Sequence, residues 1–275
     1  MGKESSMVDL DYLKGLSYPD FVGFINQWNV LPGAYTTLSK WIAFSRITEK
    51  SHILQFACTT GFQSREISSL TGCTGDAFDL SEQAVKMAKY NQEKYAPHSK
   101  INYFQADGLT LKAEPKYTHV LIGAGFQFFS DPAMAINRTL EFLKDDGFLL
   151  TSPFYIEGKI PDSLILEFQS VFGITPTTQD YKTVMRYFKG LEIIYEDRNI
   201  LIPETEEELE HYCTGIINRA CQLYNITDET VRRYMYDRLY KIKEMSNKLR
   251  PYQRYSVLVL RKRKGVYPDR LIELF

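Results

Sequence analysis

Short apolar runs alternate with amphipathic segments through the middle of the chain. Apolar, β-prone stretches bounded by turn residues predict strands at 52–57, 74–79, 101–105, 117–123 and 147–152. Apolar residues at helical spacing predict the helices between them, at 62–70, 81–95 and 131–143. Such alternation is typical of a parallel sheet covered by helices. We therefore expect an α/β fold from residue 52 onward.

Capping signals support these helix boundaries. Ser81 is a predicted N-cap, because its hydroxyl can accept from a free N–H in the first helical turn. Asp131 followed by Pro132 is typical of an N-cap and first helical residue, where the missing proline N–H has no cost. Residues 145–147 (Asp-Asp-Gly) predict a turn before the strand at 147–152.

The rhythm changes after residue 160. Short helices are predicted at 161–172 and 178–188, and strands at 191–196 and 255–261. Between these two strands, Thr205 and Glu208 form a predicted capping box that opens a helix to about residue 224. A second helix is predicted from about 228 to 249, with an apolar stripe made of Val231, Met235, Leu239, Ile242, Met245 and Leu249. Such a stripe is more typical of a core than of a ligand site.

Composition excludes several classes of function. The 275 residues are 44% hydrophobic, as is usual for a globular protein. Their net charge of −1 produces no electrostatic field that would attract nucleic acid or an anionic membrane. No apolar run approaches the roughly 18 residues that span a bilayer, and we expect a cytoplasmic protein. The start matches Met-Gly-x-x-x-Ser, a loose pattern for N-myristoylation. The four cysteines lack metal-ligand spacing, so no metal site is expected.

The segment 52–89 holds the first chemical signal. An apolar strand meets a loop of small residues ending at Gly61, a helix follows, and a second strand ends at Asp79. A tight loop allows a ligand to approach the backbone, and a carboxylate at the strand end can accept hydrogen bonds from ribose hydroxyls. This unit predicts an adenosine-containing cofactor. The loop alone does not separate a nicotinamide dinucleotide from other such cofactors.

Four further motifs, in order, narrow the choice. They are Asp79-Leu80-Ser81 after the second strand, Ala106-Asp107-Gly108 after the third, Asp131-Pro132 after the fourth, and LKDDGFL at 143–149 before the fifth. With them, the run 52–152 resembles the core of class I S-adenosylmethionine-dependent methyltransferases. The resemblance implies a Rossmann-like, seven-stranded α/β sheet, mostly parallel with an antiparallel last strand, and S-adenosyl-L-methionine as the cofactor.

The resemblance also implies the cofactor-binding residues. Asp79 corresponds to the ribose-binding acid, Leu80 to a residue against the adenine, and Asp107 to the acid that accepts from the adenine amino group. The other expected cofactor contacts are Gln55, Ala57, Thr59, Gly61, Ala106, Gly108, Gly123, Ala124 and Gly125.

Three loop positions depart from the family pattern. Gln55 stands where the family has an acid that helps to hold the cofactor's ammonium, and it keeps a carbonyl acceptor but not the charge. Ala57 and Thr59 replace glycines, so their Cβ atoms are expected to crowd the cofactor or oppose a positive φ. The hydroxyls of Thr59 and Thr60 offer alternative contacts to the cofactor carboxylate.

The residues after the fourth strand, Phe-Gln-Phe-Phe at 126–129, contain no base. The weak catalytic candidates are His211, on the helical insertion, Gln127 and Tyr35; the catalytic residues are otherwise unknown. A neutral amine acceptor needs no base, whereas a hydroxyl acceptor gains from one. The tyrosine-rich segments outside the core suit a lidded, aromatic small-molecule pocket.

The predicted organisation is a helical cap at 1–48, a cofactor-binding core at 49–200, a helical lid at 201–252, and a final strand and tail at 253–275. The leading hypothesis is methyl transfer from S-adenosylmethionine to an N or O atom of a small molecule. A catalytically silent relative and, more remotely, a nicotinamide-dependent oxidoreductase are the alternatives. The basic stretch 261–264 is typical of a solvated strand end, so nucleic acid is not the expected partner. The sequence does not give the oligomeric state.

Overall fold

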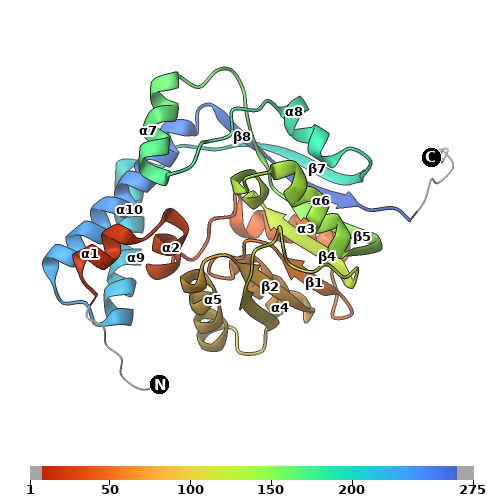
Figure 1. Ribbon diagram of the computed structural model, residues 1–275, viewed down its shortest axis with the longest axis horizontal. Helices are drawn as coiled ribbons and strands as arrows, with labels where there is room; N and C mark the ends of the chain where they lie inside the picture. The colour runs from red at the N-terminus through yellow and green to blue at the C-terminus, as the bar shows by residue number, and fades with distance from the viewer. Residues whose placement is uncertain (1–7, 265–275) are drawn as a thin grey trace.

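The computed structural model describes residues 8–264 and contains an eight-stranded sheet (Figure 1). Its strands run in the order β3-β2-β1-β4-β5-β8-β6, and β7 also pairs with β8. The strand bounds are β1 His52–Gln55, β2 Thr74–Asp79, β3 Lys100–Gln105, β4 Tyr117–Gly123, β5 Leu143–Thr151, β6 Phe154–Ile156, β7 Glu192–Ile200 and β8 Gln253–Arg261. The first five strands pair in parallel, whereas β8 is antiparallel to β5, β6 and β7.

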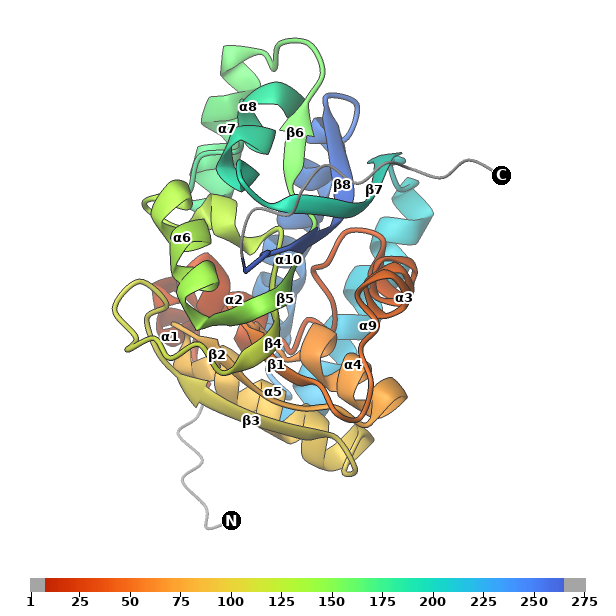
Figure 2. The same cartoon turned by 90° about the vertical axis from the view of Figure 1, so that its right-hand side faces the viewer.

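Helices cover both faces of this sheet. One face is covered by α3 (Ala34–Ser45), α4 (Phe62–Thr71) and α5 (Glu82–Tyr95). The other is covered by α6 (Pro132–Phe142), α8 (Tyr181–Met185) and the 3-10 turn η2 (Arg186–Phe188). Figure 2 shows α6 on one side of the sheet and α3 and α4 on the other. This layering is the Rossmann-like arrangement expected from the alternating pattern.

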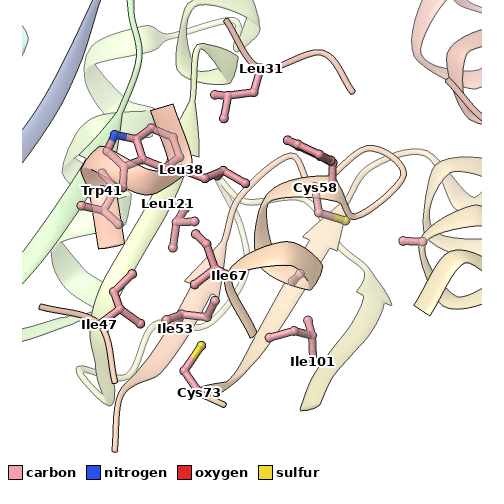
Figure 3. Packing of buried hydrophobic residues seen from close by; sticks show 14 of the residues in the cluster. Leu31, Leu38, Trp41, Ile47, Ile53, Cys58, Ile67, Cys73, Ile101 and Leu121 are labelled. Carbon is pink, nitrogen blue, oxygen red and sulfur yellow. The ribbon is translucent and has the colours of Figure 1, made fainter. Parts of the chain in front are cut away.

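The core under α3 and α4 is made of hydrophobic residues, most of them aliphatic, from the helices and the sheet (Figure 3). Ile53 of β1 and Leu121 of β4 lie between Trp41 of α3 and Ile67 of α4, and all four are fully buried. Because these strands are covered on both faces, they read as continuous apolar runs in the sequence. This packing fixes the strand ends from which the loops of the site emerge.

A second helical layer lies beside the sheet (Figure 1). It combines α1 (Leu10–Gly15) and α2 (Tyr18–Phe24) with α7 (Asp162–Phe172), α9 (Glu206–Tyr224) and α10 (Glu229–Leu249). These helices share one apolar core, in which Phe24, Phe168 and Met235 are buried. We call them the helical unit. The N-terminal segment and the inserted helices, far apart in sequence, therefore form one packed body.

The capping predictions are confirmed. Ser81 accepts from the backbone N–H of Ala84, Asp131 caps α6, and Thr205 and Glu208 form the capping box of α9. The whole apolar stripe predicted for 228–249 is buried. These local signals succeeded because they depend on residues within a single helical turn.

Two features differ from the expectation. The three-residue strand β6 was not predicted; it directly follows Pro153 and is too short for a pattern of period two. The Asp-Asp-Gly turn lies within β5 instead of before it, with Asp146 at φ +62° and a register shift against β4. The loose myristoylation pattern and most of the predicted tail lie outside the described residues. No helix in the described part of the chain is long and apolar enough to cross a membrane.

Candidate functional site

The loop that follows β1 keeps a glycine-like backbone at positions that lack glycine. Ala57 has φ +48° and Thr59 has φ +46°, while Gly61 has φ +80°. Left-handed backbone costs a residue with a Cβ roughly 1–2 kcal/mol. We expected side chains here to oppose a positive φ. This expectation is wrong, because Ala57 and Thr59 both adopt the left-handed conformation. The surrounding structure holds the loop in that shape despite the cost.

Gly61 is the loop position that cannot accept a side chain. A Cβ built there would lie 2.8 Å from the hydroxyl oxygen of Tyr103, and its positive φ would be strained as well. The Tyr103 hydroxyl lies 3.1 Å from the hydroxyl of Ser64 and donates to the carbonyl of Gly61 at 3.2 Å. The start of α4 is thereby fixed against β3. This explains why Gly61 is the one glycine of the loop that the sequence retains.

Asp79 ties the end of β2 to the loop. Its carboxylate accepts from the backbone N–H of Thr59 at 2.8 Å and from that of Ser81 at 2.9 Å. Burial raises the pKa of the Asp79 carboxyl, and the N–H groups of Ser81 and Thr59 oppose that rise. The side chain is only 7% exposed. A carboxylate offers about four acceptor positions, so Asp79 keeps capacity for further donors.

Gln55 is the last residue of β1, and one of its two amide atoms, Oε1, forms a hydrogen bond within the protein. Its Oε1 accepts from the backbone N–H of Ser64 at 2.9 Å, which fixes the start of α4. Its Nε2 is fully buried and has no hydrogen-bond partner among the described residues. The acceptor that was expected to replace the family's acid is thus partly used by the fold, and it keeps one lone pair beside the unpaired Nε2 donor.

Thr60 faces the N-terminal segment instead of a ligand. Its hydroxyl donates to the carbonyl of Gln27 at 2.7 Å, and the residue is fully buried. The expectation that this hydroxyl contacts a cofactor carboxylate is wrong, because the cap sequesters it. The Thr60 carbonyl accepts from Asn91 and Arg65, both at 3.1 Å. Asn91 in turn exchanges two amide hydrogen bonds with Asn26, each 2.8 Å long.

The predicted adenine side lies at the ends of β2 and β3. Leu80 is 70% exposed, and the Ala106 N–H donates to the Asp79 carbonyl at 3.1 Å. Asp107 accepts from the backbone N–H of Leu109 at 2.9 Å. A Cβ at Gly108 would lie about 3.0 Å from the ring of Phe78, so a side chain there would require the neighbouring rings to move by a few tenths of an ångström.

Gly123, Ala124 and Gly125 continue from the end of β4 into the 3-10 turn η1 (Gly125–Phe128). Gly123 has φ +53°, and a Cβ built on it would lie 2.9 Å from Nε2 of Gln63. A Cβ on Gly125 would lie 3.3 Å from the Cβ of Ala57. The loop after β1 and the end of β4 thus approach each other closely. Gln63, on the first turn of α4, was not predicted as a site residue, because no family motif covers it.

The catalytic candidates have different surroundings. Gln127 donates to the carbonyl of Phe154 and accepts from its N–H, both at 2.8 Å, which fastens η1 to β6. Tyr35 is 53% exposed on α3 and packs edge-on against Phe62, the first residue of α4. His211 is exposed on α9. None of these three side chains forms a hydrogen bond with Asp79 in the described part of the chain. Their catalytic role stays a prediction.

The basic stretch 261–264 is engaged with its own surroundings. Arg261 lies 3.3 Å from a carboxylate oxygen of Asp146, and Arg263 pairs with Glu192. Lys262 donates to two backbone carbonyls at the end of α6, at 2.8 and 3.0 Å. These contacts fasten β8 to β5 and β7.

The loop and strand ends fit an adenosine cofactor. The loop has the shape of a glycine loop, because its backbone is left-handed at three positions. The buried carboxylate at the end of β2 can accept further hydrogen bonds. Gln55 Nε2 is an orphaned buried donor at the same edge. These features lie where ligands bind in open parallel sheets, outside the carboxyl ends of the strands.

Comparisons with known proteins agree with this geometry. Residues 53–147 match a family model described as a methyltransferase domain. A malonyl-[acyl-carrier protein] O-methyltransferase of Halalkalibacterium halodurans is 31% identical over 175 residues, which cover 60% of this chain and 62% of that protein. The match therefore spans less than two thirds of that relative's own length.

Solved structures share the fold over most of the chain. The crystal structure of MccD protein has a TM-score of 0.70 at 28% identity, covering 86% of this chain and 100% of that one. A methyltransferase from Geobacter sulfurreducens, solved with S-adenosyl-L-homocysteine, has a TM-score of 0.67 at 14% identity, covering 89% and 98%. Together with the strand-end site, these findings show that residues 53–147 are a methyltransferase domain and that the chain has the fold of S-adenosylmethionine-dependent methyltransferases.

Proposed function

We propose that this protein transfers a methyl group from S-adenosylmethionine to a nitrogen or oxygen atom of a small molecule. The observation that carries the proposal is the loop after β1. It holds left-handed backbone at Ala57, Thr59 and Gly61 and presents a backbone N–H to the carboxylate of Asp79. Strained backbone at residues with side chains clusters at ligand sites, and two such residues in one loop support a ligand there.

The chain's own residues would divide the work as follows. Asp79 would accept from the ribose hydroxyls through its remaining acceptor positions. Asp107 would accept from the adenine amino group, with the exposed Leu80 against the ring. When bound, S-adenosylmethionine supplies a methyl group on a positively charged sulfur, which needs an acceptor lone pair in line with the breaking bond. The protein then contributes mainly position and exclusion of water.

The acceptor would lie between the strand ends and the helical unit. The cap is fastened to the cofactor loop through Thr60 and Asn91, and Arg219 of α9 donates to the carbonyl of Asn26 at 3.1 Å. The helical unit is therefore tied to the same edge of the sheet as the loop. Two proteins similar to this chain support a small acceptor group: the malonyl-[acyl-carrier protein] O-methyltransferase, and a phosphoethanolamine N-methyltransferase of Haemonchus contortus with a TM-score of 0.66 at 16% identity.

A catalytically silent relative is the second candidate. It is favoured by Gln127, which stands where a base would follow β4 but uses its amide on the backbone of Phe154. Turnover distinguishes the two. Formation of S-adenosylhomocysteine should be measured with a panel of small amines, alcohols and carboxylates. Release above the acceptor-free rate with at least one class supports methyl transfer, whereas binding without release across the panel supports the silent protein.

A further inference from the structure

Three buried polar atoms without partners gather at one edge of the sheet. They are Nε2 of Gln55, Oε1 of Gln63 and Oγ of Ser152, and none has a hydrogen-bond partner among the described residues. Gln55 and Ser152 are fully buried, and Gln63 is 7% exposed. Leaving a buried polar atom unpaired costs about 1–3 kcal/mol. Three such atoms in one place need an explanation.

Gly123 joins the three positions. Gln55 pairs in register with Leu121, two residues before Gly123 on β4. The Gln63 amide lies beside Gly123, so close that an added Cβ would be 2.9 Å from its Nε2. Ser152 directly follows β5 and donates its backbone N–H to the Gly123 carbonyl at 2.8 Å. Because Gly123 has no side chain, the Gln63 amide can lie against the backbone at the end of β4.

The start of α4 holds two of the side chains in place. The backbone N–H of Ser64 donates to Gln55 Oε1, so the Gln55 amide cannot turn over without losing that bond. Gln63 precedes Ser64 on the same turn, directly after Phe62. The Gln55 amide thus presents a fixed donor, Gln63 presents an acceptor, and the Ser152 hydroxyl can do either. All three groups are neutral.

Such a set matches a ligand group that carries donors and acceptors together. The amino-acid end of S-adenosylmethionine carries an ammonium, which only donates, and a carboxylate, which only accepts. At the Gln55 position, where the family has an acid, the amide oxygen is uncharged and already accepts from Ser64, while Nε2 is an unpaired donor. An ammonium therefore gains from an acceptor besides the shared Gln55 oxygen, and Gln63 Oε1 is an unpaired acceptor that lies close to Gly123.

We infer that Gln55, Gln63 and Ser152 form a neutral polar subsite for the amino-acid end of the cofactor. Gln63 accepts from the ammonium in place of the missing acid, and Gln55 Nε2 with the Ser152 hydroxyl donates to the carboxylate. This inference rests on the proposed function, because it specifies how the same cofactor is held. Gln63 and Ser152 lie outside the motifs that identify the family.

Calorimetric titration with two ligands tests the subsite without any turnover. S-adenosylhomocysteine carries the amino-acid end, whereas 5′-methylthioadenosine has the adenosine and sulfur but lacks it. Gln63→Leu should weaken S-adenosylhomocysteine about 10- to 100-fold, the range for a hydrogen bond to a charged group. Ser152→Ala should weaken it about 2- to 10-fold. Both variants should bind 5′-methylthioadenosine as the wild type does.

Two controls separate binding from folding. Gln92 on α5 also has a buried Oε1 without a partner, and its Nε2 donates to the Ile101 carbonyl. Gln92→Leu should leave the ratio of the two affinities unchanged. Gln63→Glu keeps an acceptor and should retain S-adenosylhomocysteine binding. Melting temperatures of the ligand-free Gln63→Leu and Ser152→Ala proteins should not fall, since each change removes an unpaired buried atom.

The outcomes are distinguishable. If the wild type binds both ligands and Gln63→Leu binds S-adenosylhomocysteine equally well, the subsite is wrong and the proposed function stands. Equal losses for both ligands would also overturn the subsite, because they show a general disturbance of the site. If the wild type binds neither ligand, the proposed function and the subsite both fail.

Discussion

The Asp79 carboxylate accepts a hydrogen bond of 2.8 Å from the backbone N–H of Thr59, a residue held at φ +46°. The bond joins the end of β2 to the loop after β1. It compensates part of the strain of a β-branched residue in a left-handed conformation. One carboxylate therefore supports the loop and faces the region where the cofactor is proposed to bind.

The strain at Ala57 and Thr59 predicts that glycine stabilises the protein at either position. Relief of about 1–2 kcal/mol of left-handed strain outweighs the entropy cost of glycine, about 0.5–1 kcal/mol. We expect Ala57→Gly and Thr59→Gly to raise the free energy of unfolding in urea by about 0.5–1 kcal/mol each. Gly61→Ala is the opposing control and should lower it, because the new Cβ meets Tyr103. A loss of stability in Thr59→Gly would show that the loop is not strained there.

Cofactor affinity should fall on acidification sooner than an ordinary aspartate would cause. Burial raises the pKa of the Asp79 carboxyl. The ionised carboxylate can accept hydrogen bonds from both ribose hydroxyls, whereas a proton on the carboxyl takes up one of these acceptor positions. As the pH falls through that raised pKa, the fraction able to accept shrinks and binding weakens. Titrations of S-adenosylhomocysteine over a pH series measure this midpoint. A midpoint at or below the usual aspartate value of about 3.9 would contradict the prediction.

The fold was largely predictable because its signals are local. Ser81, Asp131 and the Thr205–Glu208 box each cap a helix within one turn, and the apolar runs mark strands that are buried on both faces. The strand β6 was missed because its three residues are paired by β8, about 100 positions later. Local pattern carries no information about such a partner.

The site was predictable only where a family motif covers it. Asp79 and Gly61 were singled out from the motif pattern, and their cofactor contacts stay predictions. The expectation for Thr60 is wrong because the cap residue Gln27, 33 positions earlier, takes its hydroxyl. Gln63 gave no signal, since its significance depends on the closeness of Gly123 in space. Which polar atoms remain unpaired is a tertiary property and cannot be read from sequence.

The paired amides of Asn26 and Asn91, which join the cap to the cofactor loop, predict a large stability effect. Asn91→Ala removes both mutual hydrogen bonds and one to the Thr60 carbonyl, leaving the buried Asn26 amide unpaired. We expect a loss of about 2–4 kcal/mol in the free energy of unfolding. The exposed Asn102, which donates to Asp76 at 3.1 Å, provides the control. Asn102→Ala should change stability by less than about 0.5 kcal/mol; similar losses in both variants would contradict the assignment.

His119 predicts a loss of stability in mild acid. Burial lowers the pKa of this imidazole from 6.5 to about 4, and its Nε2 lies 3.0 Å from the Ser45 carbonyl oxygen. Between these two values the unfolded chain binds the proton and the folded protein does not, so stability falls as pH decreases. The shift corresponds to about 3 kcal/mol. Urea unfolding at pH 7 and pH 4.5 should show a smaller acid loss in His119→Gln; an equal loss would exclude His119 as the source.

Binding of the cofactor by the purified protein tests the central claim most directly. Calorimetric titration with S-adenosylmethionine should give saturable binding to the wild type. His211→Ala should bind equally well, because this exposed helix residue is not part of the cofactor loop. Asp79→Ala should abolish binding, since it removes the acceptor for the ribose and the support for Thr59. Absence of binding to the wild type at millimolar cofactor, or normal binding by Asp79→Ala, would contradict the account.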